Sequence, residues 1–292
     1  MRWGDGYIAV DWGTTNRRAF ALGHDGQLQD SFADALGILS ISPGGFGDAV
    51  ADLRRRLGNR PMLLSGMVGS NRGWLEAPYV ACPAAPADLA GAILWVEADA
   101  VGIVPGVSQI EPGADVMRGE EVQAFGALAA GLIPHDALVC HPGTHAKWIQ
   151  LAASRIHAFQ TMMTGELFGL IKSHGILSGQ LQQDVAADAS FLEGARVGLA
   201  GADLLSALFA IRARRLLGRG PDNDASYASG LLIGCDVRSG LRLHRDGPIA
   251  IIGRSDLRAL YTAALIAAGR DVVEVDGAAA FLAGIHALTE LL

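Results

Sequence analysis

Residues 8–20, IAVDWGTTNRRAF, combine residue types that suit a metal-bound polyphosphate. A short apolar run ends in Asp11, a turn follows, and a second run begins at Arg17, which predicts two strands joined by a tight turn. A carboxylate at a strand end can hold Mg²⁺, and free backbone N–H groups in a turn can hold phosphate oxygens. We therefore expect Asp11 to be a Mg²⁺ ligand and the turn to bind phosphate. The predicted phosphate-binding residues of the turn are small, hydroxyl or amide residues: Gly13, Thr14, Thr15 and Asn16.

Two residues of this segment keep an alternative explanation. Asp11 can instead form an Asx-type turn that caps residues 13–15. Arg17 can neutralise phosphate charge, or it can simply lie on the protein surface. A buried strand end rarely carries a carboxylate without a partner, which favours the functional role for Asp11.

A second turn with a Gly-Thr pair lies within residues 141–148, HPGTHAKW. It follows a buried-type strand over residues 137–140, so a strand–turn–strand unit occurs twice in the chain. Glycine lets backbone N–H groups approach an anion closely. Gly143 and Thr144 are therefore predicted to bind phosphate, with Lys147 directed either at the phosphate or at solvent.

The composition indicates an α/β protein with a substantial hydrophobic core. Of the 292 residues, 50% are hydrophobic and 18% are charged, so the core does not depend on disulfides or metal. The net charge of −7 argues against non-specific binding of nucleic acid, which relies on clustered Lys and Arg. The three cysteines lack metal-binding spacing, and no segment reads as a signal peptide or a membrane span. We expect a cytoplasmic protein that binds neither nucleic acid nor a membrane.

The predicted elements form a β-meander followed by alternating strands and helices, and this order occurs twice. It favours two α/β lobes with mixed sheets, residues 1–133 and 134–292, with the last helix a candidate for packing back on the first lobe. Residues 185–217 are expected to be largely helical with a break around 194–201. Residues 89–96 fit either a helix or a strand.

Longer motifs place these two turns in a wider pattern. The segments are SGMVGSNRGWLEAPY (65–79), DVMRGEE (115–121), PGTHAKW (142–148), MTGELF (163–168) and IAIIGRSDLRALY (249–261). In this order the chain resembles the 2-keto-3-deoxygalactonokinase family, within the superfamily of actin, hexokinase, sugar kinases and heat-shock chaperones. The resemblance implies a two-lobed ribonuclease-H-like (actin-like ATPase) fold with mixed β-sheets and an interlobe cleft. It also implies phosphorylation of a keto-deoxy sugar acid with ATP and Mg²⁺.

The last of these segments resembles the adenosine motif of the superfamily. Gly253 would let the nucleoside lie against the backbone, and Arg254 could stack on adenine. An ordinary strand–helix turn with Ser255 as the helix N-cap is compatible with the same residues.

The loop over residues 65–74 is the expected sugar-acid site. Asn71 and Arg72 would recognise hydroxyl and carboxylate groups, because the fork of an arginine matches a carboxylate. Ser65 belongs to the same loop, and Trp74 either forms an apolar wall for the substrate or holds together a purely structural loop. Two charged residues elsewhere complete the predicted substrate contacts: Arg118 and Glu166.

The catalytic base is expected within DVMRGEE, because this superfamily tends to place a carboxylate just before the second phosphate turn. Asp115 and Glu120 are equal candidates, and Glu121 ranks below them. The alternative role for the two glutamates is stabilisation of a helix N-terminus. Arg118 either binds the substrate carboxylate or pairs with one of these acids, and Glu166 either closes the site or caps its helix.

The function predicted by the resemblance is ATP-dependent phosphorylation of 2-dehydro-3-deoxy-D-galactonate to its 6-phosphate in galactonate breakdown. Three alternatives stay open: a kinase for a related acid such as 2-keto-3-deoxygluconate, an ATP-driven activator or switch on the same fold, and a nucleotide or polyphosphate hydrolase. ADP release that depends on the sugar acid separates a kinase from the last two. The oligomeric state is also open, with a homodimer as one option.

Overall fold

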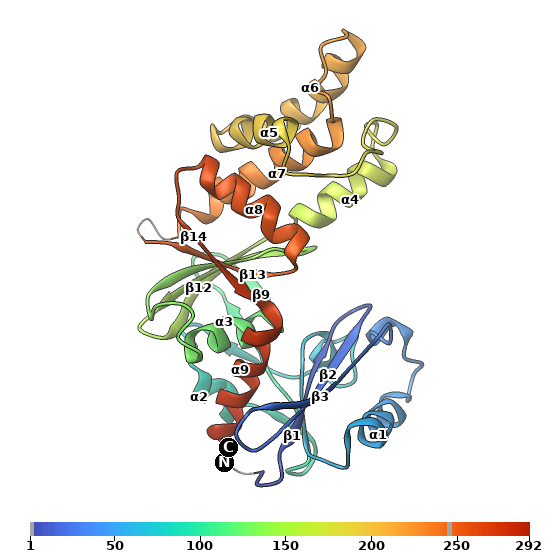
Figure 1. Ribbon diagram of the computed structural model, residues 1–292, viewed down its shortest axis with the longest axis vertical. Coiled ribbons are helices and arrows are strands. Elements are labelled where there is room, and N and C mark those ends of the chain that lie inside the picture. Colours follow the sequence, from blue (N-terminus) through green and yellow to red (C-terminus); the bar gives the residue numbers. More distant parts are fainter. Residues whose placement is uncertain (1–2, 244–246) are drawn as a thin grey trace. The chain divides into compact units, whose positions relative to one another are not determined.

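The computed structural model describes residues 3–243 and 247–292, and these form two compact units (Figure 1). The first unit consists of the chain up to His135 together with Ala152–Ala158 and Gly277–Leu292. The second unit consists of Asp136–Leu151 and Phe159–Asp276. The lobe boundary expected at residue 133 stays a prediction.

The first unit is built on a six-stranded sheet with the order β3-β2-β1-β4-β7-β6. The strands in this order are β3 (Leu28–Asp34), β2 (Arg17–Leu22), β1 (Tyr7–Trp12), β4 (Met62–Ser65), β7 (Val101–Ile103) and β6 (Leu94–Glu97). The first three strands form the predicted antiparallel meander, whereas β4 runs parallel to β1, and β7 runs parallel to β4. Helix α1 (Phe46–Leu57) buries Phe46, Val50, Leu53 and Leu57 in the core of this unit.

The second unit is built on a five-stranded sheet with the order β12-β11-β10-β13-β14. The strands are β12 (Arg155–Met162), β11 (Ala146–Ala152), β10 (Ala137–His141), β13 (Ile249–Gly253) and β14 (Val272–Asp276). β10 pairs antiparallel with β11 and parallel with β13, and β13 pairs parallel with β14.

The two sheets therefore share a common core topology. In each, the third, second, first and fourth strands in chain order lie side by side, the first hairpin is antiparallel, and the fourth strand runs parallel to the first. The second sheet then adds β14 parallel to β13, whereas the first adds β7 parallel to β4 and β6 antiparallel to β7. The predicted repeat of supersecondary units and the predicted mixed α/β sheets are confirmed. Since the first hairpin of each sheet carries a Gly-Thr turn, the two turns occupy equivalent positions.

A small third sheet and three helices complete the first unit. The sheet has the order β5-β8-β9, with β5 (Tyr79–Ala81), β8 (Gly106–Gln109) and β9 (Asp115–Met117). Helix α2 (Pro86–Gly91) precedes β6, so the segment over residues 89–96 contains both a helix end and a strand. Helices α3 (Glu120–Ala129) and α9 (Gly277–Glu290) pack closely, because a Cβ on Gly126 would lie 1.8 Å from the Ala280 carbonyl oxygen.

The helices of the second unit are α4 (Thr164–His174), α5 (Ala189–Leu199), α6 (Leu204–Leu216), α7 (Asp224–Gly240) and α8 (Ser255–Ala267). The helix break expected around residues 194–201 falls later, between α5 and α6. Gly194 and Gly198 lie inside α5, where a Cβ on either would meet the backbone of α7 at 2.1 and 2.4 Å. These glycines serve close helix packing instead of ending the helix.

Across residues 3–243 and 247–292, no helix combines the length and the apolar character that crossing a membrane requires.

Candidate active site

The turn between β1 and β2 presents its N–H groups on one side. The carbonyl oxygens of Gly13, Thr14 and Thr15 accept hydrogen bonds from the N–H groups of residues 38, 39 and 37 at 3.0, 3.2 and 3.2 Å. In a trans peptide the next N–H points opposite to the carbonyl. The N–H groups of residues 14–16 therefore point away from this contact, and none of them has a hydrogen-bond partner among the described residues. Such an array suits an anion.

Gly37 makes this arrangement of the first turn possible. A Cβ at this position would lie 2.3 Å from the Thr15 backbone and 2.4 Å from the Thr14 backbone. The segment that contains it continues as a short 3₁₀ helix, η1 (Ile38–Ser40), and so closes the turn from behind. The sequence analysis did not select Gly37, because the glycine lies outside the turn it supports.

Asp11 lies at the end of β1 with 21% of its side chain exposed. Its Oδ2 pairs with Arg18 Nη2 at 2.5 Å, while its Oδ1 has no hydrogen-bond partner among the described residues. In the register of the sheet it stands between Arg18 of β2 and Ser65 of β4. One open carboxylate oxygen beside a turn of free N–H groups fits a Mg²⁺ ion that is shared with phosphate.

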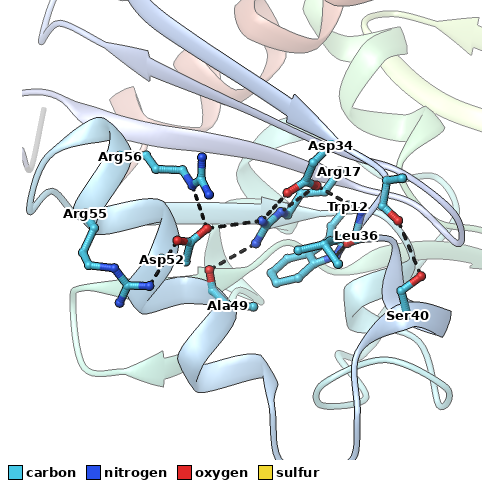
Figure 2. A network of polar contacts seen from close by, with 10 residues as sticks. Trp12, Arg17, Asp34, Leu36, Ser40, Ala49, Asp52, Arg55 and Arg56 are labelled. Carbon is cyan, nitrogen blue, oxygen red and sulfur yellow. Dashed lines mark hydrogen bonds and ion pairs between the residues drawn. The ribbon is translucent and has the colours of Figure 1, made fainter.

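The expected phosphate contact by Arg17 is wrong, and so is its alternative placement on the surface. The side chain is fully buried on the side of α1 (Figure 2). It donates to Asp34 at 2.6 Å and to the Ala49 carbonyl at 3.1 Å, and it lies 5.1 Å from the centre of the Trp12 ring. Successive side chains of a strand point to opposite faces. Arg18, not Arg17, is therefore the cation beside Asp11.

Two glycines bring the start of α3 close to the ends of β1 and β4. A Cβ on Gly66, with φ +93°, would lie 3.0 Å from the Trp12 carbonyl oxygen, and a Cβ on Gly119, with φ +107°, would lie 3.3 Å from the Gly66 Cα. Positive φ values favour glycine, so both positions need this residue. The start of α3, with its two glutamates, is thereby held against the strand end that carries Asp11.

The three candidate bases have different environments. Glu120 is half-buried, and its Oε2 accepts a hydrogen bond from the Arg118 N–H at 3.1 Å. Glu121 is fully buried, and both of its oxygens accept from the Gly119 N–H at 2.8 and 2.7 Å. Burial, followed by the charge of Glu120, raises the pKa of Glu121 to about 8. Asp115 lies in β9, where its Oδ1 accepts from the Val116 N–H at 2.8 Å. The two glutamates are brought together at the start of α3, whereas Asp115 lies in the separate three-stranded sheet.

Arg118 is a buried cation with unused hydrogen-bonding capacity. Its Nη2 donates to the Ala77 carbonyl at 2.8 Å, and its guanidinium lies 4.4 Å from the centre of the Tyr79 ring. Its Nε and Nη1 are buried and have no hydrogen-bond partner among the described residues. The Oγ of Ser65, at the end of β4, is also buried and has no hydrogen-bond partner among the described residues. Unpaired buried polar atoms are costly, so they point to a ligand or to water.

The loop after β4 contains one tryptophan that packs against the core and two exposed polar residues without side-chain partners among the described residues. The Trp74 ring stacks on Phe46 with centroids 6.0 Å apart and an interplanar angle of 8°, which supports its alternative role in holding the loop. Asn71 and Arg72 are exposed, and their side chains have no partner among the described residues. These two stay available to a polar ligand.

The second turn, between β10 and β11, is supported in the same way as the first. The Glu166 N–H donates to the Thr144 carbonyl at 2.9 Å, and a Cβ on Gly165 would lie 2.6 Å from the Gly143 carbonyl oxygen. Glu166 also pairs with His145 at 2.5 Å, so it belongs to this turn. A signal for the supporting segments was present in the sequence, since residues 37–39 and 165–167 both read Gly-x-Leu.

Two other predicted phosphate or nucleotide contacts lie near this turn. Lys147 is buried and donates to the Thr161 hydroxyl at 2.7 Å, so its placement toward solvent is wrong. Gly253 lies next to Pro142, whose carbonyl oxygen would be 3.5 Å from a Cβ on the glycine. Arg254 is 78% exposed, pairs with Asp256 at 2.6 Å, and occupies the N-cap position that was expected for Ser255.

A cavity of about 60 Å³ opens beside the second turn, within the second unit. Its wall is mainly apolar and comes from the turn and from helices α4, α7 and α8: Gly143, Thr164, Gly165, Phe168, Ser229, Leu232, Ile233, Leu257 and Tyr261. A mainly apolar wall beside a glycine-threonine turn suits a nucleoside with attached phosphates.

Two sheets of this topology, each with a glycine-threonine turn in its first hairpin, define the ribonuclease-H-like fold of actin-like sugar kinases. The family model for 2-keto-3-deoxy-galactonokinase matches residues 11–288, and the chain belongs to this family. It is 38% identical to the 2-dehydro-3-deoxygalactonokinase of Escherichia coli over 97% of each chain.

Solved structures agree with this placement. A crystal structure from Sinorhizobium meliloti, described as a 2-dehydro-3-deoxygalactonokinase protein, shares 36% identity and a TM-score of 0.90 over 97% of this chain and 98% of that one. A structure described as an N-acetylglucosamine kinase from Porphyromonas gingivalis shares the fold, with a TM-score of 0.51 and 15% identity over 96% and 98% of the chains. The chain is thus a member of a sugar-acid kinase family.

Proposed function

We propose that the protein transfers the γ-phosphate of ATP to the primary hydroxyl of 2-dehydro-3-deoxy-D-galactonate and forms the 6-phosphate. The observation that carries the proposal is the pair of equivalent turns with glycine-supported backbones, together with family membership over residues 11–288. Each turn, within its own unit, has a backbone arrangement that suits phosphate oxygens. The cavity beside Gly143 would take the nucleoside.

We propose Glu120 as the catalytic base. It begins α3, next to the Gly119 backbone that approaches Gly66 and the end of β4, whereas Asp115 belongs to another sheet. A general base must come within hydrogen-bond reach of the attacking hydroxyl. Glu121 would stay protonated at neutral pH, since its pKa is about 8, and would hold the Gly119 backbone in place.

The substrate carboxylate would be recognised by cations of the first unit. Arg118 offers two buried nitrogen atoms, Nε and Nη1, that have no partner among the described residues, and Arg72 offers an exposed guanidinium in the neighbouring loop. Asn71 and Ser65 would bind hydroxyl groups. Glu166 pairs with His145 at the second turn, so we assign it to that turn and not to the sugar acid.

Mg²⁺ would be held by Asp11, directly or through water, and would neutralise charge on the phosphates. The open Oδ1 of Asp11 fits this role, and Arg18 holds the other carboxylate oxygen in place. The turn N–H groups orient the phosphate chain so that the hydroxyl and the γ-phosphate meet in line.

The proposal is tested by ADP release in the presence of a panel of keto-deoxy sugar acids. We expect strong stimulation by 2-dehydro-3-deoxy-D-galactonate and weak stimulation by its gluconate epimer. Stronger stimulation by the epimer would identify the gluconate compound as the substrate. ADP release that is independent of any sugar acid would instead favour a hydrolase or an ATP-driven switch.

The base is tested by Glu120→Gln with Asp115→Asn as the matched control. Loss of a general base lowers kcat by about 10²- to 10⁴-fold. We expect this loss for Glu120→Gln and a near-normal kcat for Asp115→Asn. The reverse pattern would make Asp115 the base.

A further inference from the structure

A buried carboxylate with three hydrogen-bond donors lies beneath the cavity of the second unit. Asp236, on α7, is 3% exposed. It accepts from Trp148 Nε1 and from the Tyr261 hydroxyl, each at 2.5 Å, and from the Thr164 hydroxyl. Burial raises the pKa of Asp236. None of the steps proposed above uses this side chain.

The three donors come from three elements that surround the second turn. Trp148 lies in β11, the strand that leaves the turn. Thr164 begins α4 and directly precedes Gly165, which packs on the turn backbone. Tyr261 lies in α8, and both it and Thr164 line the cavity with Gly143. One carboxylate therefore connects the turn, the segment that supports it and the cavity wall.

The surrounding helix is shaped to keep this connection rigid. A Cβ on Gly240, one turn after Asp236 on α7, would lie 2.0 Å from the Trp148 indole ring. The ring thus lies flat against α7 with its N–H on the carboxylate. Binding geometry is held well when the residues beneath a site are locked by packing and hydrogen bonds.

We infer that Asp236 is a positioning residue for ATP binding. It fixes the second turn and the cavity wall in the arrangement that binds ATP. The inference rests on the proposed function, since it assumes that the cavity and the turn bind ATP. Asp236 does not touch the nucleotide in this account. Its effect reaches ATP through Thr164, Gly165 and Tyr261.

The test compares Asp236→Asn with Asp224→Asn. Asp224 is also buried and also on α7, and it pairs with Arg215 at 2.7 Å, but Arg215 does not line the cavity, whereas Thr164 and Tyr261 do. Asparagine keeps the shape of aspartate but turns an N–H group toward one of the three donors. Misplacement of a binding group by about 1 Å can cost as much as 100-fold. We expect the Kd and KM for ATP to rise about tenfold or more in Asp236→Asn, while KM for the sugar acid stays unchanged.

Calorimetric titration with ATP measures the Kd without relying on turnover. Asp224→Asn should bind ATP like the wild type, and Asp236→Glu, which restores the charge, should recover part of the affinity. Wild-type affinity in Asp236→Asn, or equal losses in both asparagine variants, would overturn the inference. If Asp236→Asn does not fold, Tyr261→Phe removes one of the three hydrogen bonds and should shift the Kd in the same direction; an unchanged Kd there would also overturn it.

The two proposals fail in different ways. Absence of sugar-dependent turnover by the wild type would contradict the proposed function, yet the ATP titrations would still decide the role of Asp236. A wild type that phosphorylates the sugar acid, together with Asp236→Asn of unchanged ATP affinity, would contradict only the positioning role.

Discussion

The turn at residues 13–16 and the turn at residues 142–145 are each held from behind by a segment that returns after the third strand of its sheet. Gly37 supports the first turn and Gly165 supports the second, and both contacts would be blocked by a Cβ. In both, a backbone N–H of the returning segment bonds a carbonyl of the turn. The shared topology thus produces two similar backbone arrangements that suit anions.

The charges around the two turns differ. The first has Asp11 at the strand end, paired with Arg18. The second has His141 at the equivalent strand end, opposite Lys147 in the ladder, and adds the exposed pair of His145 and Glu166. The comparison shows that topology fixes the backbone of each turn, while the strand residues set the charges beside it. Metal binding is therefore expected at the first turn.

The largest effect should follow Asp11→Asn, which removes the carboxylate from the first turn. Charge stabilisation by a bound metal is worth several kcal/mol, so we expect kcat to fall by about 10³-fold or more. Steady-state kinetics over a range of Mg²⁺ concentrations measures this, with circular dichroism as the check on folding. Near-normal turnover in the folded variant would remove the distinction between the two turns.

Arg17→Leu should destabilise the first hairpin without any specific effect on ATP. It would leave Asp34 and the Ala49 carbonyl without their buried partner. Breaking a buried pair costs about 3–5 kcal/mol, and partial exposure of Asp34 reduces this to roughly 2–4 kcal/mol. Urea unfolding gives the loss. The matched control is Arg54→Leu, whose ion pair with Glu97 is more exposed and should cost about 1 kcal/mol or less. A similar loss in both variants would contradict the structural role of Arg17.

Glu121→Gln should change how stability depends on pH. The folded pKa of about 8 lies above the ordinary value of 4.5, so the folded state keeps a proton that the unfolded state loses. The wild type therefore loses stability as the pH rises from about 4.5 to 8, by up to roughly 5 kcal/mol. The variant should lack this decline and exceed the wild type in stability at pH 9. If the free energy of unfolding differed between wild type and variant by the same amount at pH 5 and at pH 9, Glu121 would be ionised in the folded protein.

The smallest effect should follow His145→Gln at the second turn. The pair with Glu166 is solvent-exposed, and exposed pairs are worth about 0–1 kcal/mol. We expect KM for ATP to change by less than about fivefold and kcat to stay the same. Steady-state kinetics checks this, with His135→Gln as a control, since His135 is an exposed histidine outside the turn that pairs with Ser154. A loss as large as that of Asp11→Asn would mean that the second turn, too, depends on a charged side chain.

The sequence could predict features whose residues are neighbours in the chain. Asp11 and its turn, the second turn and the meander follow from local patterns of strand, glycine and polar residue. Gly37 and Gly165 were missed because each supports a turn more than twenty residues away in the sequence.

Orientation and long-range burial explain the remaining errors. Arg17 and Arg18 differ only in which face of β2 they occupy, and that face is set by the packing of α1. Asp236 lies inside a helix with no local motif, so only the convergence of Trp148, Thr164 and Tyr261 reveals it.

The central claim, phosphoryl transfer to a primary hydroxyl, is tested most directly by the proton-coupled ³¹P NMR spectrum of the product formed from ATP and 2-dehydro-3-deoxy-D-galactonate. A phosphate ester on a CH₂–OH carbon couples to two equivalent or nearly equivalent protons, so we predict a new triplet together with the signals of ADP. A doublet would place the phosphate on a secondary hydroxyl. Inorganic phosphate as the sole new signal would contradict the kinase account.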